Sequence, residues 1–168
     1  AVYPVEPIIR HGAAVRVEKQ PDATALLEET VHTIRKWQQD GYETIAVICR
    51  EEKEAAELAE QLKSYMEIVN CNPGTTEFGD GVMVLSVAYT KGLEFDAVLL
   101  YDPTQKKYPA DNGHVKLLYV AATRALHELV VLYHGNLSRI LTDPVSKEKK
   151  QKVFAAETLT KAKELSLI

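Results

Sequence analysis

Continuous apolar runs of strand length are the feature that most constrains the fold of this chain. Residues Thr44–Cys49 and Phe95–Tyr101 are almost entirely apolar, and Val82–Val87 and Leu129–Tyr133 have the same character. A strand with one face in water alternates apolar and polar residues, whereas a strand buried on both faces does not. With a shorter candidate strand at Ala14–Val17, these runs predict a mostly parallel sheet covered on both faces.

Helices are predicted between these strands. The first begins after an N-cap at Asp22 and ends at Gly41, and its apolar stripe consists of Leu27, Val31, Ile34 and Trp37. The second has apolar residues three and four positions apart, namely Ala55, Leu58, Ala59 and Leu62. Residues Val115–Ala125 form the third. Strands that alternate with helices predict an α/β three-layer sandwich.

The composition describes one ordinary domain. A chain of 168 residues buries roughly two thirds of the surface that its unfolded form exposes, so it folds without a metal or a disulfide. We expect a core at about residues 14–135 and a C-terminal extension at 136–168. Cys49 and Cys71 form no C-x-x-C pair, which argues against a zinc site and favours a reducing compartment.

Charge and hydropathy exclude several classes of protein. The N-terminus lacks the features of a signal peptide, and no apolar run is long enough to span a membrane, so a cytoplasmic protein is expected. The formal net charge is -4, which means that any nucleic acid would have to be met by a local basic patch and by backbone amides.

Polar residues that follow the buried runs are candidate ligand-binding residues, because ligands gather at the carboxyl ends of parallel strands. Arg50 and Asp102 each follow such a run. Arg50 also precedes a predicted helix, where its guanidinium and the free helix amides can face one anion. The alternative for Arg50 is a surface arginine paired with Glu51 or Glu54.

Residues Ser86–Phe95 are a polar segment between two buried strands. Gly92 allows a close backbone approach, and the hydroxyls and Lys91 can contact phosphate, while Glu94 can accept a hydrogen bond from a sugar hydroxyl. A tight connection with a solvated lysine fits the same residues.

A third segment, Tyr119–Ala125, combines small residues with one long cation, Arg124. A fixed arginine can stabilise the charge that develops on a transferring phosphoryl group. The alternative is a salt bridge from Arg124 to Glu128, four positions later.

In this order, "TIAVICR", "VMVLSVAYTKGLEFDAVLLYD" and "KLLYVAATRALHEL" closely resemble motifs IV, V and VI of superfamily 1 DNA helicases of the UvrD/Rep/PcrA type. The resemblance covers Ile45 to Tyr133, roughly half of the chain. It implies a RecA-like fold, that of the second motor domain of these helicases.

The resemblance also implies roles for individual residues. Arg50 and Arg124 would reach the γ-phosphate of an ATP held in the cleft between two RecA-like domains, and Glu94 would lie near the nucleotide sugar beside Gly92. Ser86, where the family usually has a threonine, would touch the backbone of single-stranded DNA. Two neighbours in the same motif are further candidate nucleic-acid contacts: Thr90 and Lys91.

Some positions depart from the family pattern. Ala88 stands where motif V usually has a histidine, and Gly113 and His114 replace an acidic pair ahead of motif VI. The chain has neither a G-x-G-K-[ST] loop nor an acidic D-E box, the parts that hold the β-phosphate and Mg²⁺. We therefore expect the ATP and Mg²⁺ to be held mainly by an N-terminal RecA-like domain, and this chain alone to be inactive.

The spacing of the motifs favours one branch of the family. Only 41 positions separate Arg50 from Lys91, which leaves no room for the inserted domain of the larger members. This compactness resembles helicase IV and the HelD proteins, as does the segment Tyr3–Gly12. The main hypothesis is the C-terminal motor domain of a DNA helicase or translocase acting on single-stranded DNA. The alternatives are a domain of a HelD-like factor that remodels RNA polymerase, and a stand-alone interaction module.

Overall fold

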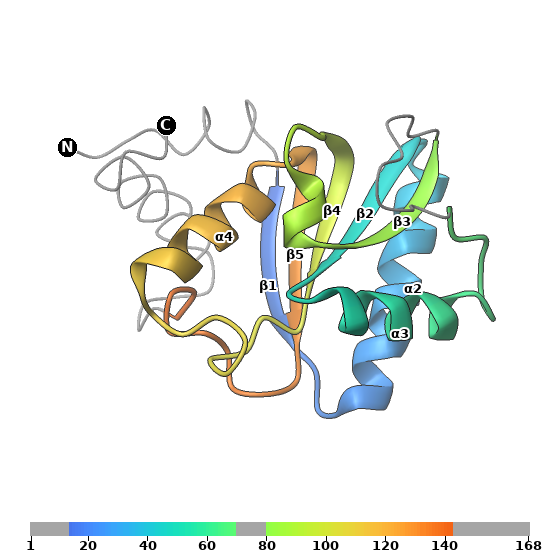
Figure 1. Ribbon diagram of the computed structural model, residues 1–168. Helices are drawn as coiled ribbons and strands as arrows, with labels where there is room; N and C mark the ends of the chain where they lie inside the picture. Colours follow the sequence, from blue (N-terminus) through green and yellow to red (C-terminus); the bar gives the residue numbers. More distant parts are fainter. Residues whose placement is uncertain (1–13, 70–79, 143–168) are drawn as a thin grey trace.

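The computed structural model describes residues 14–69 and 80–142, which form a five-stranded, all-parallel sheet with the strand order β1-β5-β4-β2-β3 (Figure 1). The strands are β1 (Ala14–Lys19), β2 (Thr44–Cys49), β3 (Gly81–Ser86), β4 (Phe95–Tyr101) and β5 (Ala125–Tyr133). The helices are α2 (Ala23–Gln39), α3 (Glu52–Leu62), the short 3₁₀ helix η1 (Val87–Thr90) and α4 (Asn112–Ala122). No helix in these ranges is long and apolar enough to cross a membrane.

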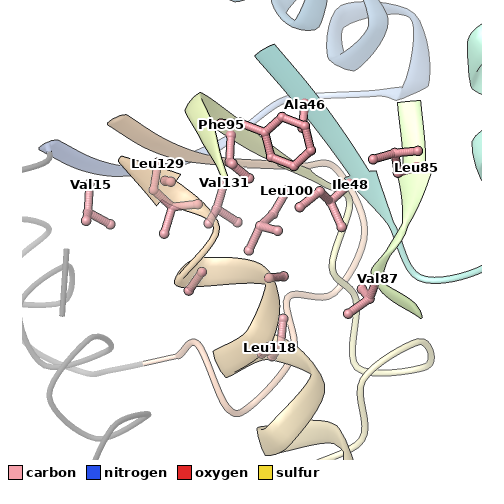
Figure 2. Close-up of a cluster of buried hydrophobic side chains, with 14 of the residues drawn as sticks. Val15, Ala46, Ile48, Leu85, Val87, Phe95, Leu100, Leu118, Leu129 and Val131 are labelled. Atoms are coloured by element: carbon pink, nitrogen blue, oxygen red, sulfur yellow. The ribbon is translucent and has the colours of Figure 1, made fainter. Parts of the chain in front are cut away.

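The sheet has a hydrophobic core on each face. On one face, Leu118 of α4 packs against strand residues that include Leu100 and Val131, as Figure 2 shows. On the other face, α2 and α3 cover the sheet, and Trp37 and Leu58 are almost fully buried there. Figure 1 shows α4 on one side of the strands and α2 with α3 on the other. The predicted α/β three-layer sandwich with a parallel sheet is therefore confirmed.

The sequence signals for β2, β4 and α2 were sufficient to place these elements. β2 and β4 have the predicted bounds. The Asp22 carboxylate accepts a hydrogen bond from the Ala25 amide at 2.8 Å, which caps the first turn of α2 as predicted.

The prediction for the third helix was wrong at both ends. α4 begins at Asn112, three residues early, because Asp111 caps it by accepting a hydrogen bond from the His114 amide at 2.9 Å. It ends at Ala122, so Arg124 lies in the turn after the helix and not within it. β5 starts already at Ala125, since that residue pairs with Phe95 of β4.

The segment that precedes β3 makes one further strand-like contact. Ile68 forms an isolated parallel bridge with Val82 of β3, and the end of this segment lies outside the described residues. Of the C-terminal extension expected at 136–168, the part beyond residue 142 also lies outside the described residues.

Because all five strands are parallel, the sheet has two chemically distinct edges. We call the end of the sheet where the strands begin the amino edge, and the end where they finish the carboxyl edge. Neither term refers to the edge strands, which are β1 and β3. Arg50 follows β2 at the carboxyl edge, whereas Arg124 immediately precedes β5 at the amino edge. The candidate site residues therefore fall into two groups.

Candidate nucleotide and nucleic-acid contacts

Arg124 is fixed at the amino edge by the end of α4. Its Nε donates to the Val120 carbonyl oxygen at 3.0 Å, and Nη2 donates to the Thr123 hydroxyl at 3.1 Å. The Thr123 hydroxyl in turn donates to the Tyr119 carbonyl oxygen at 2.9 Å. A cation at the C-terminal end of a helix is favoured by the helix dipole, so this position holds the guanidinium in place.

The same arginine contacts the segment that resembles motif V. Its Nη1 donates to the Thr90 carbonyl oxygen at 3.5 Å, and its own carbonyl oxygen accepts from the Phe95 amide at 2.9 Å. The second bond places Glu94, the residue before Phe95, at the same level of the sheet as Arg124. Residues that are 30 positions apart in the sequence are thus brought together at the amino edge.

Gly92 shapes the exposed loop of this site. Its φ is +79°, a left-handed conformation that favours glycine, and no atom lies within 4 Å of where a Cβ would stand. Lys91 and Glu94 on either side of it are exposed. We call Lys91, Gly92, Glu94 and Arg124 the amino-edge cluster. It presents two cations, one carboxylate and an accessible backbone.

The two predicted hydroxyl contacts are both buried. Thr90 is fully buried, and its hydroxyl donates to the Val87 carbonyl oxygen at 2.7 Å, which closes η1. Ser86 is 3% exposed at the end of β3, and its hydroxyl has no hydrogen-bond partner among the described residues. Thr90 therefore supports the loop through its side chain, whereas the Ser86 hydroxyl is available to a ligand that reaches it.

Arg50 lies far from the amino-edge cluster. Ile48 is paired with Leu100, so Arg50 stands at the level of Asp102, whereas Arg124 stands at the level of Glu94. A strand advances about 3.3 Å per residue, so about 25 Å separate the two arginines along the sheet. The structure therefore does not bring together the two arginines that the resemblance assigns to one phosphate.

Around Arg50, three loops are joined by an ion-pair network. The Glu54 carboxylate accepts a hydrogen bond from the Arg50 backbone amide at 3.2 Å and forms an ion pair with Lys107. Lys107 also donates to the carbonyl oxygen of Asp102 at 3.1 Å and lies 3.4 Å from its carboxylate. Arg50 therefore does contact Glu54, one of the two alternative partners expected from the sequence, but the contact is made by the Arg50 backbone amide. The Arg50 guanidinium carbon lies 6.0 Å from the centre of the Tyr108 ring.

Asp102 has the only positive φ, +50°, of any residue other than glycine in the described ranges. Its carboxylate accepts hydrogen bonds from the amides of His134 at 3.0 Å and Gly135 at 3.4 Å. These bonds tie the end of β4 to the end of β5 and offset the cost of the left-handed backbone. The sequence singled out Asp102 as a residue at a strand end. The pairing of Lys107 with Glu54 carried no sequence signal, because 53 positions separate the two residues.

Glu128, the alternative partner of Arg124, has other contacts. Its carboxylate accepts from Trp37 Nε1 at 2.7 Å and from the Tyr42 hydroxyl at 3.1 Å. Burial and the neighbouring Glu128 carboxylate raise the pKa of Tyr42 to about 12. Glu128 therefore ties β5 to α2.

The described residues hold no group of three or more histidine, cysteine, aspartate or glutamate side chains that could bind a metal ion. Burial raises the pKa of the Cys49 thiol well above its usual value, so this cysteine is held as a neutral core residue.

Comparison with known proteins finds similar helicase C-terminal domains. Residues 81–132 match the UvrD-like helicase C-terminal domain family. A solved C-terminal domain of a possible DNA helicase from Lactobacillus plantarum WCFS1 is 27% identical, covers 80% of this chain and 84% of its own, and has a TM-score of 0.68. No curated protein sequence matches this chain.

A second solved structure shares the fold at much lower sequence identity. The C-terminal domain of the DEAD-box protein Dbp5 is 12% identical, with 94% of this chain and 87% of that one covered and a TM-score of 0.51. At this identity the likeness shows the fold alone, which is the RecA-like fold of helicase C-terminal domains. The segment that matches the UvrD-like family runs from β3 to β5 and includes the whole amino-edge cluster, so the part of the chain with the candidate nucleotide contacts is similar to UvrD-like helicase C-terminal domains.

Proposed function

We propose that this chain is the C-terminal motor domain of an ATP-dependent superfamily 1 DNA helicase or translocase. The observation that carries the proposal is the attachment of Arg124 to the motif V segment. Its guanidinium donates to the Thr90 carbonyl oxygen, and its backbone accepts from Phe95. This attachment fixes one arginine, one carboxylate and one exposed glycine at the same edge of the sheet.

In this proposal the amino-edge cluster faces an ATP held by an N-terminal RecA-like domain. Arg124 stabilises the negative charge that grows on the γ-phosphoryl group, and its contacts with α4 hold it in place before the reaction. Glu94 accepts a hydrogen bond from the sugar, and Gly92 lets the backbone approach the nucleotide. In this proposal Mg²⁺ is held mainly by the N-terminal domain.

Single-stranded DNA is proposed to contact the other end of the motif V segment. Ser86 ends β3 at the carboxyl edge, and the exposed Lys91 lies on the segment that runs from Ser86 to the start of β4. One continuous segment thus touches both ligands. When the cleft closes on ATP, this segment would shift relative to the bound DNA strand. Such a shift would couple ATP hydrolysis to stepping along the DNA.

The test is ATP turnover by the full-length protein with Arg124→Ala. We expect turnover to fall by about three powers of ten, as loss of an arginine finger does, while the Kd for ATP changes only a few-fold. Arg124→Lys keeps the positive charge but lacks the planar guanidinium with its paired N–H donors, so it should recover little ATP turnover. Arg139→Ala removes an exposed arginine of the C-terminal loop and serves as the control. Near-wild-type turnover of Arg124→Ala would refute the proposal.

A remodelling factor for RNA polymerase is the second candidate. The observation that favours it is Ala88, an exposed alanine where the family usually has a DNA-contacting histidine. The two functions differ in what stimulates the full-length ATPase. Single-stranded DNA should raise the turnover of a helicase strongly, whereas RNA polymerase should do so for the remodelling factor. This chain alone should hydrolyse no ATP in either case.

A further inference from the structure

A pocket of about 280 Å³ lies between α3 and the edge strand β3, on the face of the sheet opposite to α4. One wall is made of small side chains, those of Ala55, Ala56 and Ala59 of α3. Ser86 and Tyr89, from the segment that joins β3 to β4, also line it. A smooth alanine wall leaves room for a flat group beside the helix.

The pocket contains an unsatisfied hydroxyl. Ser86 is 3% exposed, and its Oγ has no hydrogen-bond partner in the described part of the chain. The neighbouring strand offers none, because Ser86 is paired in register with Cys49, a buried thiol. A buried polar group without a partner costs about 1–3 kcal/mol, so an occupant with a polar edge gains by binding here.

Tyr89 forms the rim of the pocket. It is one of two large hydrophobic side chains exposed in the described ranges, the other being Tyr65. A hydrogen bond between the Tyr89 hydroxyl and Glu52 of α3 raises the pKa of this tyrosine. The same bond ties Tyr89 to Glu52, which also lines the pocket, and the exposed part of the Tyr89 side chain offers aromatic surface for stacking.

We infer that this pocket binds one base of a single-stranded nucleic acid, stacked on Tyr89 with its polar edge at the Ser86 hydroxyl. The inference rests on the proposed function and specifies how the strand is held. An apolar side chain of a partner protein would leave Ser86 unsatisfied. Three charged residues line the pocket: Glu52, Glu60 and Lys63. Lys63 forms an ion pair with Glu60 at 2.7 Å, so Glu52 leaves the lining with a net negative charge that disfavours a phosphate inside.

The test measures binding of a fluorescent single-stranded DNA oligonucleotide to this chain, beside an abasic oligonucleotide of the same length. Base stacking on an aromatic side chain accounts for about tenfold in affinity or more. We therefore expect Tyr89→Ala to weaken binding of the normal strand about tenfold and to leave binding of the abasic strand unchanged. Tyr65→Ala removes the other exposed tyrosine and is the matched control.

Two further variants test the pocket itself. Ala59→Leu fills the pocket from the helix side, and Ser86→Ala removes its hydroxyl. Both variants should weaken binding of the normal oligonucleotide more than binding of the abasic one. Circular dichroism verifies that each variant is folded. If the folded variants bind both strands equally, if the wild type does not prefer the normal strand, or if a free mononucleotide binds as tightly as the strand, the inference is wrong. These outcomes leave the Arg124 test untouched, so failure of the pocket and failure of the proposed motor function are distinguishable.

Discussion

Arg50 and Arg124 lie at opposite edges of one parallel sheet, with about 25 Å between them along the strands. At the carboxyl edge, the Arg50 backbone amide donates to Glu54, a member of the ion-pair network, and the Arg50 guanidinium lies over the Tyr108 ring. Arg124 belongs to the amino edge with Glu94. A single γ-phosphate is much smaller than this separation, so we expect only one of the two arginines to contact it.

The two arginines should therefore differ in kinetics. In the full-length protein, we expect Arg50→Ala to change kcat for ATP hydrolysis less than tenfold, against about a thousandfold for Arg124→Ala. Single-turnover measurements at saturating ATP would separate the chemical step from binding. An equal loss of kcat in both variants would mean that both arginines act on the same phosphate after all.

The backbone of Asp102 provides a prediction about stability. Asp102→Ala removes the acceptor of the His134 and Gly135 amides and places alanine at a positive φ, so we expect the free energy of unfolding to fall by about 2–4 kcal/mol. Asp102→Asn keeps an acceptor oxygen and tolerates the left-handed region, so it should lose about half as much. Urea denaturation followed by the fluorescence of Trp37, the single tryptophan, measures both. Equal losses in the two variants would contradict this account.

The sequence was enough to predict the sheet because burial of a strand on both faces requires an apolar run. Thr44–Cys49 and Phe95–Tyr101 were bounded correctly for that reason. The end of α4 was missed, because Tyr119–Ala125 is composed largely of residues that suit a helix. Only the pairing of Ala125 with β4 decides that the strand begins there.

The candidate site could be predicted only in part. The resemblance to motifs V and VI made Glu94 and Arg124 candidate site residues, but their shared level in the sheet depends on the register between β4 and β5. The Glu54 and Lys107 pair was missed, because contacts between distant loops leave no periodic signal. The separation of the two arginines was implicit in the sequence, since one follows a strand and the other precedes one.

Lys107 is expected to stabilise the carboxyl edge. The side chains of Glu54 and Asp102 are only 22% and 11% exposed, so Lys107→Met leaves two poorly hydrated carboxylates without their cation. We expect a loss of about 1–3 kcal/mol in the free energy of unfolding, measured by urea denaturation. In the double variant Lys107→Met/Glu54→Gln, the loss in the free energy of unfolding should be smaller than the sum of the two single losses, because the two residues act as a pair.

The surface pair of Lys63 and Glu60 is the control for this experiment. Its side chains are 45% and 73% exposed, and exposed ion pairs contribute about 0–1 kcal/mol. Lys63→Met should thus cost little. If Lys107→Met cost no more than Lys63→Met, the network at the carboxyl edge would have no stabilising role.

Tyr42 makes the stability of the domain sensitive to alkaline pH. Its pKa is raised from 10.0 to about 12 by burial and by Glu128, so the folded state favours the neutral phenol. Below pH 10, tyrosine is neutral in both the folded and the unfolded states, and its contribution to stability is fully present. Between pH 10 and 12 the unfolded state releases the proton first, so the free energy of unfolding falls as the pH rises.

The measurement is the urea midpoint as a function of pH for the wild type and for Tyr42→Phe and Glu128→Gln. Tyr42→Phe should reduce the alkaline slope, although it also loses the hydrogen bond to Glu128 and with it some stability at neutral pH. Glu128→Gln keeps an acceptor but removes the negative charge, so its slope should lie between the other two. Part of the decline should persist in every variant, because burial also raises the pKa of Tyr101 and Tyr108. A Tyr42→Phe slope identical to that of the wild type would show that this phenol ionises equally in the folded and unfolded chains.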